Sequence, residues 1–379
     1  MNIINAINTK PLSLNFKHNK QKVIFFISEP DSFLLSNKNV KSSNINFCGK
    51  TTLDTSINNI FEKFNKPVVP KEKIEAWLGQ FEEADRKTAA LLLENIDFKT
   101  YPDCFEESKQ LHQKLVLKLK QDGFDTKFFE NVDFSKPYTA KSGDITSYMY
   151  RKANKIRSVN FKTTDALKFD PQNSHKDRAL VILDDYMATG VQFLFEFLAR
   201  KQENIDLFDG YKKVYVLANT ANDKAIEKFD LLQLNHPDKV ADIIWGEYPE
   251  IALNSSKEKA VEDLAKMSDK KMEFMYQNRE IPLLSPENKK LSAEQKIELR
   301  AFLDKYNVYK YPFGVGNNQG HTSFFYSAPN TLPDILWNPK ISKKECSQSS
   351  SKWFPLLQRT EDISVYQCAD SVPKQFHVF

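Results

Sequence analysis

Short apolar runs alternate with helical patterns in the middle of the chain, and this alternation constrains the fold more than any other feature. Residues 179–183 form an apolar run between charged residues, which is typical of a strand buried on both faces of a sheet. Further strands are expected at residues 214–218 and 240–245, with helices that begin at about Val191 and Asp223. This order indicates an α/β fold with a doubly wound, mostly parallel sheet. Ligands of such sheets bind at the carboxyl ends of the strands.

The regions on either side of this core differ from it in composition. Residues 1–65 are rich in Asn, Lys and Ser, which predicts a mostly disordered leader. Apolar residues then recur at helical spacing, and Trp77 is expected to anchor a core. Helices are also expected over 258–275 and 293–306, the second with Ser292 as its N-cap. We therefore predict four parts: the leader (1–65), a helical N-terminal cap (66–125), the α/β domain with a C-terminal hood (126–337, the hood within 308–337), and an extension (338–379) that packs back near 353–359.

Charge and cysteine content narrow the class of protein. The 54 basic and 50 acidic residues leave a net charge of +4, which neither implies nucleic-acid binding nor excludes it. The four cysteines lie far apart without a Cys-x-x-Cys pair, so neither a zinc site nor a disulfide framework is predicted. No apolar run reaches the roughly 18–20 residues of a membrane span. These features favour a cytoplasmic protein that binds no membrane and holds no metal by its own side chains.

Residues 181–192 combine the groups that one ligand would need. The strand delivers Asp184 and Asp185 to its carboxyl end, and two neighbouring carboxylates can accept hydrogen bonds from the vicinal hydroxyls of a ribose. The loop that follows opens a helix, whose unpaired N–H groups and dipole favour a phosphate. We therefore predict a site for a ribose that carries a 5′-phosphate. The residues expected to hold the phosphate are Met187, Ala188, Thr189, Gly190, Val191 and Gln192.

The order of these residues resembles the phosphoribosyl pyrophosphate (PRPP) motif of the type I phosphoribosyltransferases, which has four apolar residues, two acids and then a loop rich in Thr and Gly. Gln192 departs from it, because the motif usually carries a hydroxyl there. The resemblance implies that Asp184 and Asp185 act in catalysis and that Mg²⁺ is held mainly by PRPP. It also implies a mobile lid over residues 157–178 and a further loop at the site after Ala218. Lys141, Ser142 and Gly143 stand where the superfamily has its pyrophosphate loop.

Motifs outside this segment are similar to those of a bacterial phosphoribosyltransferase-like family associated with conflict or defence systems (PRTase-CE-like). The similarity spans about residues 72–360 and implies a role in bacterial defence or stress. It does not name an acceptor. It rests on residues 77–81 with Asp85, Lys141-Ser142-Gly143 with Tyr150-Arg151, Phe313-Gly314-Val315-Gly316, residues 329–333 through Trp337, and residues 353–359.

Three functions fit these residues to different degrees. The first is an enzyme that transfers ribose 5-phosphate from PRPP to an unknown, base-like nitrogen acceptor and releases pyrophosphate. The second is a non-catalytic module that senses PRPP or a nucleotide and regulates a partner, and the sequence leaves open a protein partner or a homo-oligomer. The third is phosphoryl transfer of the receiver or haloacid dehalogenase type. The helix start at Thr189-Gly190, directly after the acids, disfavours this third function.

Overall fold

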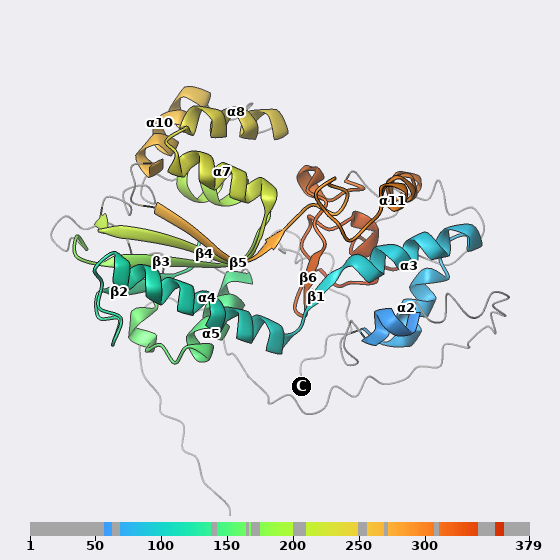
Figure 1. The fold of residues 1–379 in the computed structure, drawn as a ribbon, viewed down its shortest axis with the longest axis horizontal. Coiled ribbons are helices and arrows are strands. Elements are labelled where there is room, and N and C mark those ends of the chain that lie inside the picture. The colour runs from blue at the N-terminus through green and yellow to red at the C-terminus, as the bar shows by residue number, and fades with distance from the viewer. Residues whose placement is uncertain are drawn as a thin grey trace, which may run out of the picture. The chain divides into compact units, whose positions relative to one another are not determined.

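A central sheet of parallel strands organises the fold (Figure 1). The computed structural model describes residues 57–62, 69–137, 142–163, 167, 175–199, 210–248, 256–268, 272–306, 311–339 and 353–359. All of them belong to one unit, Gly49–Phe379. Residues 57–62 are helical, whereas the rest of the predicted leader and most of the predicted extension lie outside the described residues.

The four strands of the sheet stand in the order β2-β3-β4-β5. They are β2 (Val132–Ser135), β3 (Ala179–Met187), β4 (Lys213–Asn222) and β5 (Met272–Glu280). The two apolar runs of the sequence form the central strands, β3 and β4, in which nearly every residue is buried. Each pair of neighbouring strands is parallel. The predicted α/β fold with a parallel sheet is therefore confirmed.

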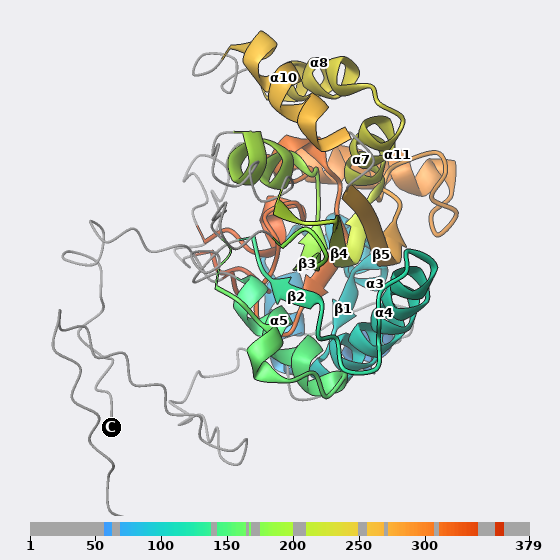
Figure 2. The same cartoon turned by 90° about the vertical axis from the view of Figure 1, so that its left-hand side faces the viewer.

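Helices cover both faces of this sheet (Figures 1 and 2). On one face, α4 (Tyr101–Gln121) and α5 (Ser142–Ala153) enclose an apolar core that contains Tyr150. On the other face lie α7 (Asp223–Gln233) and the π-helical η5 (Gln192–Ala199), with Phe229 in the core. Two further helices, α8 (Pro237–Glu247) and α10 (Lys257–Ser268), pack beyond α7.

A second group of elements comes from both ends of the described chain. Three helices, α2 (Lys71–Leu78), α3 (Arg86–Asn95) and α11 (Ala293–Lys305), share one apolar core with residues from 328–336 and 356–357. Trp77 is fully buried in this core and Ser292 caps α11, so both predictions are confirmed. Two short strands, β1 (Asp97–Lys99) and β6 (Thr322–Phe324), pair in parallel beside it. Short 3₁₀ turns lie at Glu83–Asp85, Ser158–Asn160, Val315–Asn317 and Asp334–Leu336.

Two predicted elements are wrong, and both errors concern the third strand. Residues 240–245 lie in α8, where Val240, Ala241 and Ile244 are buried at helical spacing. The strand is β5 instead, and it takes up the end of the helix expected over 258–275. In addition, β4 runs four residues beyond the predicted 214–218, so the loop expected after Ala218 is strand as far as Asn222.

Three expectations concern the chain as a whole. No helix of the described part is long and apolar enough to cross a membrane. Among the cysteines, Cys104 is buried and unpaired, while Cys48, Cys346 and Cys368 lie outside the described residues. The predicted division into leader, cap, α/β domain and extension stays a prediction.

Candidate functional site

The predicted acids lie at the carboxyl end of the central strand β3. Asp184 and Asp185 occupy two of its last four positions, and Asp184 is in register with Ala218 of β4. Successive side chains of a strand point to opposite faces, so the two carboxylates leave β3 in different directions and a single ligand must lie across the end of the strand to meet both. Asp184 is half-buried, and its Oδ1 accepts a hydrogen bond from the Asp185 N–H at 3.0 Å. Asp185 is only 7% exposed.

The carboxylate of Asp185 joins three segments that lie far apart in the sequence. Ser142, in the first turn of α5, donates its hydroxyl to Oδ1 at 2.9 Å, and Tyr326 donates its hydroxyl to Oδ2 at 2.6 Å. The structure therefore brings Ser142, predicted for pyrophosphate, into direct contact with Asp185. Gly143 is buried in the same turn of α5. Lys141 lies outside the described residues, and so does much of the predicted lid.

The predicted phosphate loop is a tight turn between β3 and η5. Gly190 has a φ of +73°, a conformation that other residues rarely adopt. The Thr189 hydroxyl accepts a hydrogen bond from the Val191 N–H at 3.3 Å, which stabilises the turn. The side chains of Met187 and Val191 are buried in the core, so only their backbone groups could meet a phosphate.

This loop is held against the neighbouring helix. A Cβ added to Gly190 would lie 3.4 Å from the Phe229 ring and 3.6 Å from Ala225, both on α7. Gln192 opens η5 and is exposed, while Ala188 and Thr189 are half-buried. The first N–H groups of a helix have no partner within it. The turn and the helix start therefore offer the backbone donors that a phosphate requires.

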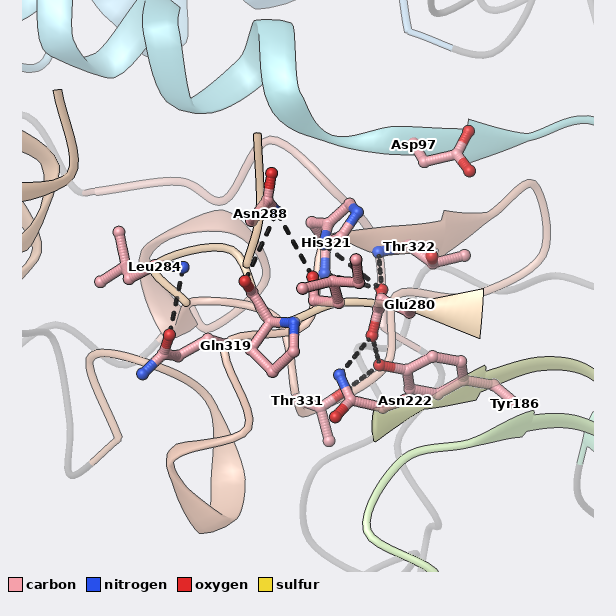
Figure 3. A network of polar contacts seen from close by, with 12 residues as sticks. Asp97, Tyr186, Asn222, Glu280, Leu284, Asn288, Gln319, His321, Thr322 and Thr331 are labelled. Atoms are coloured by element: carbon pink, nitrogen blue, oxygen red, sulfur yellow. Dashed lines mark hydrogen bonds and ion pairs between the residues drawn. The ribbon is translucent and has the colours of Figure 1, made fainter. Parts of the chain in front are cut away.

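Sequence reasoning missed a buried carboxylate at the end of the edge strand β5. Glu280 accepts hydrogen bonds from the N–H groups of His321 (2.9 Å) and Thr322 (2.7 Å) on one oxygen. Its other oxygen accepts from the Asn222 side chain at 2.8 Å and from the hydroxyl of Tyr186. Figure 3 shows Glu280 between these two pairs of donors. Because Tyr186 is the last but one residue of β3 and Asn222 is the last of β4, Glu280 fastens the 321–322 backbone to the carboxyl edge of the sheet.

The segment that Glu280 holds belongs to the predicted hood. Burial, and then the charge of Glu280, keep the pKa of Tyr186 well above its ordinary value, so its hydroxyl remains a donor. Gly314 has a φ of +80°, and a Cβ there would come within 1.9 Å of the Thr331 carbonyl oxygen. The hood therefore folds back on itself so closely that only glycine fits. The dense pattern of Gly and aromatic residues at 308–337 was the only sequence signal for this structure.

Two buried polar groups lie on β4 beside the acids. Among the described residues, Asn219 Oδ1 and Thr220 Oγ1 have no hydrogen-bond partner, and both side chains are almost completely buried. Thr220 is in register with Tyr186 of β3. Buried polar atoms are nearly always satisfied, by protein, by water or by a ligand. These two atoms are therefore further candidates for contact with a ligand at this edge.

A family model decides what the site belongs to. The model of the PRTase-CE family matches residues 74–359, which is 286 of the 379 residues. The chain belongs to the PRTase-CE family. The match covers both acids, the turn at Gly190, the N-terminus of α5 and the hood. The predicted resemblance to a phosphoribosyltransferase-like family is thus confirmed.

Other comparisons add little to the PRTase-CE assignment. No curated protein matches the chain. Among solved structures, a hypothetical protein from Neisseria gonorrhoeae with bound ppGpp is 14% identical and covers 34% of this chain and 74% of its own, with a TM-score of 0.22. The AQ2163 protein from Aquifex aeolicus is 12% identical and covers 57% of this chain and 86% of its own, with a TM-score of 0.25. Both TM-scores are below 0.5, so neither structure carries an argument about ligand or mechanism.

The PRTase-CE site offers three kinds of chemistry at one edge of the sheet. Two carboxylates can accept hydrogen bonds and stabilise positive charge. Backbone N–H groups at the starts of η5 and α5 can hold anionic oxygens. A cover of aromatic residues from the hood, with Tyr326 on Asp185, can exclude water.

Proposed function

We propose that this protein binds PRPP at the carboxyl end of β3 and transfers its ribose 5-phosphate to a nitrogen acceptor, with release of pyrophosphate. One observation carries the proposal. The pair Asp184 and Asp185 lies among the last four residues of a central parallel strand, which is followed by a turn with positive φ at Gly190 and a helix start. This sequence of groups suits a sugar that carries a phosphate, and it lies within the part of the chain that the family model matches.

Each group has a role in this reaction. Asp184 and Asp185 accept hydrogen bonds from the ribose hydroxyls, and their charge stabilises the positive charge that develops on the sugar ring. The backbone of the 187–192 segment holds the 5′-phosphate. Ser142 and Gly143, with Lys141, hold the pyrophosphate. The nitrogen lone pair forms the bond to C1, the C1–oxygen bond breaks towards pyrophosphate, and the proton on nitrogen leaves to water.

The residues present fit a magnesium ion that the substrate itself carries. In the described ranges, no three His, Cys, Asp or Glu side chains come together as metal ligands. A half-buried carboxylate, Asp184, lies at the edge of the sheet beside the proposed substrate. Mg²⁺ commonly keeps several waters and takes its other ligands from phosphate oxygens and one or two carboxylates. When bound, it would neutralise charge on the pyrophosphate leaving group.

Ligand-dependent stability tests the binding proposal. At a concentration of Mg²⁺ and PRPP near 100 times the Kd, binding adds about 2.7 kcal/mol to the free energy of unfolding. For a chain of this size we expect the Tm to rise by about 4 °C. Asp184→Asn should abolish this shift, whereas the control Asp242→Asn, on the exposed side of α8, should retain it. A wild-type protein whose Tm does not respond would overturn the proposal.

A non-catalytic sensing function has an observation in its favour. Gln192 stands where the superfamily motif has a hydroxyl, and both oxygens of Asp185 already accept hydrogen bonds from within the chain. We therefore propose that release of pyrophosphate be measured in parallel with binding, using a panel of nitrogen bases. Binding without release would favour the sensing module. Gln192→Thr restores the hydroxyl and should tighten PRPP binding in either case.

The biological setting is a proposal that rests on family resemblance. We propose that the protein acts in the cytoplasm, in bacterial defence or stress. Phage plating on bacteria that carry the wild-type gene or the Asp184→Asn variant tests this idea. Equal plating on both strains would count against a defence role that depends on the site.

A further inference from the structure

We infer that Tyr326 gates the ribose site by donating to Asp185 the hydrogen bond that a sugar hydroxyl would otherwise donate. The inference rests on the proposed function and extends it, because it assigns specificity to a residue outside the motif. Tyr326 lies in the hood, 141 residues from Asp185 in the sequence. We refer to residues 322–327, which carry it, as the cover segment.

The hydrogen bond from Tyr326 occupies the Asp185 carboxylate, to which a ribose hydroxyl of PRPP would bind. Asp185 is only 7% exposed, and each of its carboxylate oxygens accepts one hydroxyl, from Ser142 at 2.9 Å and from Tyr326 at 2.6 Å. A carboxylate can accept more than two hydrogen bonds. A third donor nevertheless cannot approach while the side chains around Asp185 leave so little of it accessible. A ribose hydroxyl must therefore replace one of these two donors.

Tyr326 is the donor that can leave. Ser142 belongs to the first turn of α5, whose following residues pack against the sheet. Tyr326 lies in a short turn after β6, where the Phe324 N–H donates to the Ser327 carbonyl and the Ser327 N–H to the Phe324 carbonyl, both at 3.2 Å. This closed turn can move as a unit. Besides the hydroxyl of Tyr326, the turn is attached to the body of the protein by the bond from the Phe325 N–H to the Lys99 carbonyl, at 2.9 Å, and by the contact of the Phe325 ring with Tyr101.

The ring of Tyr326 is positioned by aromatic neighbours. It stacks on Phe324 with ring centroids 5.4 Å apart and meets Phe325 edge-on at 4.9 Å. Cys104 and Met149 belong to the same small apolar cluster. These contacts involve the ring, whereas the hydroxyl bonds to Asp185 and also interacts with the Thr146 side chain of α5. Replacing Tyr326 with Phe therefore removes the hydrogen bond while it retains the packing.

The Tyr326 hydroxyl can be replaced by a sugar hydroxyl as the hydrogen-bond donor to Asp185. Burial, and then the negative charge of Asp185, raise the pKa of Tyr326 well above its ordinary value. The hydroxyl therefore remains a proton donor at neutral pH, as a sugar hydroxyl does. Because both groups are neutral donors of one hydrogen bond, the exchange of one for the other leaves the charge of Asp185 satisfied in both states.

Two measurements test the inference. In the first, the Kd of PRPP with Mg²⁺ is compared between the wild type, Tyr326→Phe and Tyr306→Phe. Tyr306 also donates its hydroxyl to a carboxylate, that of Asp85 at 2.7 Å, but it is partly buried at the end of α11 and packs against the core of α2, α3 and α11. Tyr326→Phe removes the competing donor and should lower the Kd about tenfold. Tyr306→Phe should leave the Kd unchanged.

The second measurement is hydrogen exchange with peptide resolution. Addition of PRPP with Mg²⁺ to the wild type should speed exchange in the cover segment, because Tyr326 leaves Asp185, and slow it over residues 184–192. Tyr326→Phe alone should speed exchange in the peptides that contain the Phe325 N–H. If the wild type binds PRPP and Tyr326→Phe binds no tighter, or if PRPP protects the cover segment, the gating inference fails while the proposed function stands. If neither protein binds PRPP, the proposed function fails and the inference fails with it.

Discussion

The sheet and the assembly of α2, α3 and α11 are built in different ways. The sheet joins strands that follow one another along the chain, and its helices cover it locally. The second assembly joins residues from distant parts of the sequence: the Gln80 side chain donates to the Phe354 carbonyl at 3.1 Å, and the Lys305 ammonium lies 2.7 Å from Asp85. The acids of the candidate site come from the sheet. The groups that cover them come from the hood, which is continuous with the second assembly.

The contacts between the hood and the sheet connect the two regions at the candidate site. Glu280 and Asp185 are buried carboxylates at which the hood meets the carboxyl edge of the sheet. Their donors include backbone groups at 321–322 and the hydroxyl of Tyr326. Substitutions in the second assembly, that of α2, α3 and α11, should therefore affect ligand binding through the hood. Substitutions in the sheet should affect it directly.

The largest effect on the free energy of unfolding is expected from Trp77→Ala in the second assembly. Trp77 is fully buried and meets Phe81 edge-on with ring centroids 4.7 Å apart. Loss of such a side chain typically lowers the free energy of unfolding by about 3–5 kcal/mol. Urea denaturation measures this change. Trp77→Phe should cost much less, because it keeps a ring and removes an indole N–H that has no hydrogen-bond partner among the described residues.

A matched change in the sheet region separates stability from binding. Phe229→Ala removes a ring that stacks on Phe274 at 4.0 Å, and its cost in unfolding free energy should be similar. Phe229 also lies against the turn at Gly190. At a temperature where both variants are folded, Phe229→Ala should therefore weaken PRPP binding more than Trp77→Ala. Equal losses of binding would contradict the division between the two regions.

The next prediction concerns pH and the face of the sheet that α4 covers. Burial lowers the pKa of His112 to about 4, and its ring contacts the Tyr150 hydroxyl at 2.9 Å. The ordinary pKa of 6.5 applies in the unfolded chain, which therefore binds more protons than the folded protein between pH 6.5 and 4. Stability must fall as the pH falls through this window, by up to about 3 kcal/mol from this residue. Other groups titrate here too, so the measurement is the difference in unfolding free energy between wild type and His112→Gln at pH 7 and pH 4. An identical pH dependence in both proteins would refute the assignment.

A further prediction concerns the junction between the sheet and the hood. Glu280→Gln retains an oxygen for the N–H groups of His321 and Thr322, but it turns an amide N–H₂ towards the donors Tyr186 and Asn222. Loss of charge-assisted hydrogen bonds at a buried site should cost about 2 kcal/mol of stability. Chemical denaturation measures it, with the exposed Glu287→Gln as control. We also expect faster hydrogen exchange across 320–324, and a hood that stays protected would show that Glu280 does not hold it.

Much of the sheet could be predicted because its signals are local. The strand at 179–183, the acids that end it and the helix starts at Val191 and Asp223 all follow from neighbouring residues. The error at 240–245 arose because a buried helix face and a short buried strand look alike over six residues. The strand β5 was missed for a different reason. It is the edge of the sheet, its sequence mixes charged and apolar residues, and most of its side chains are only partly buried.

In the candidate site, too, local patterns could be predicted and contacts between distant segments could not. Ser142, Gly143, Asp185 and Gly190 could be chosen from local patterns, and the structure places Ser142 on Asp185. The contact of Asp185 with Tyr326 could not, because it spans 141 residues and involves a tyrosine with no distinguishing neighbours. Glu280 was hidden for a similar reason, since its donors come from three distant segments. Long-range contacts are set by the packing of whole elements, which the sequence pattern of a single segment does not contain.

The smallest effect tests whether local stability is the same in both regions. Ser292 caps α11 in the second assembly, and Thr100 caps α4 on the sheet. Each hydroxyl accepts a hydrogen bond from the backbone N–H three residues later. Replacing either with Ala should cost about 1 kcal/mol, because the cap satisfies a helix N–H whatever the helix packs against. Denaturation of Ser292→Ala and Thr100→Ala, with Ser292→Asp as a variant that keeps a capping oxygen, measures both. If Ser292→Ala lowered the free energy of unfolding several times more than Thr100→Ala, the cap of α11 would have to stabilise the core of the second assembly as well as its own helix. The contrast between a locally specified sheet and an assembly specified at a distance would then extend to the helix ends.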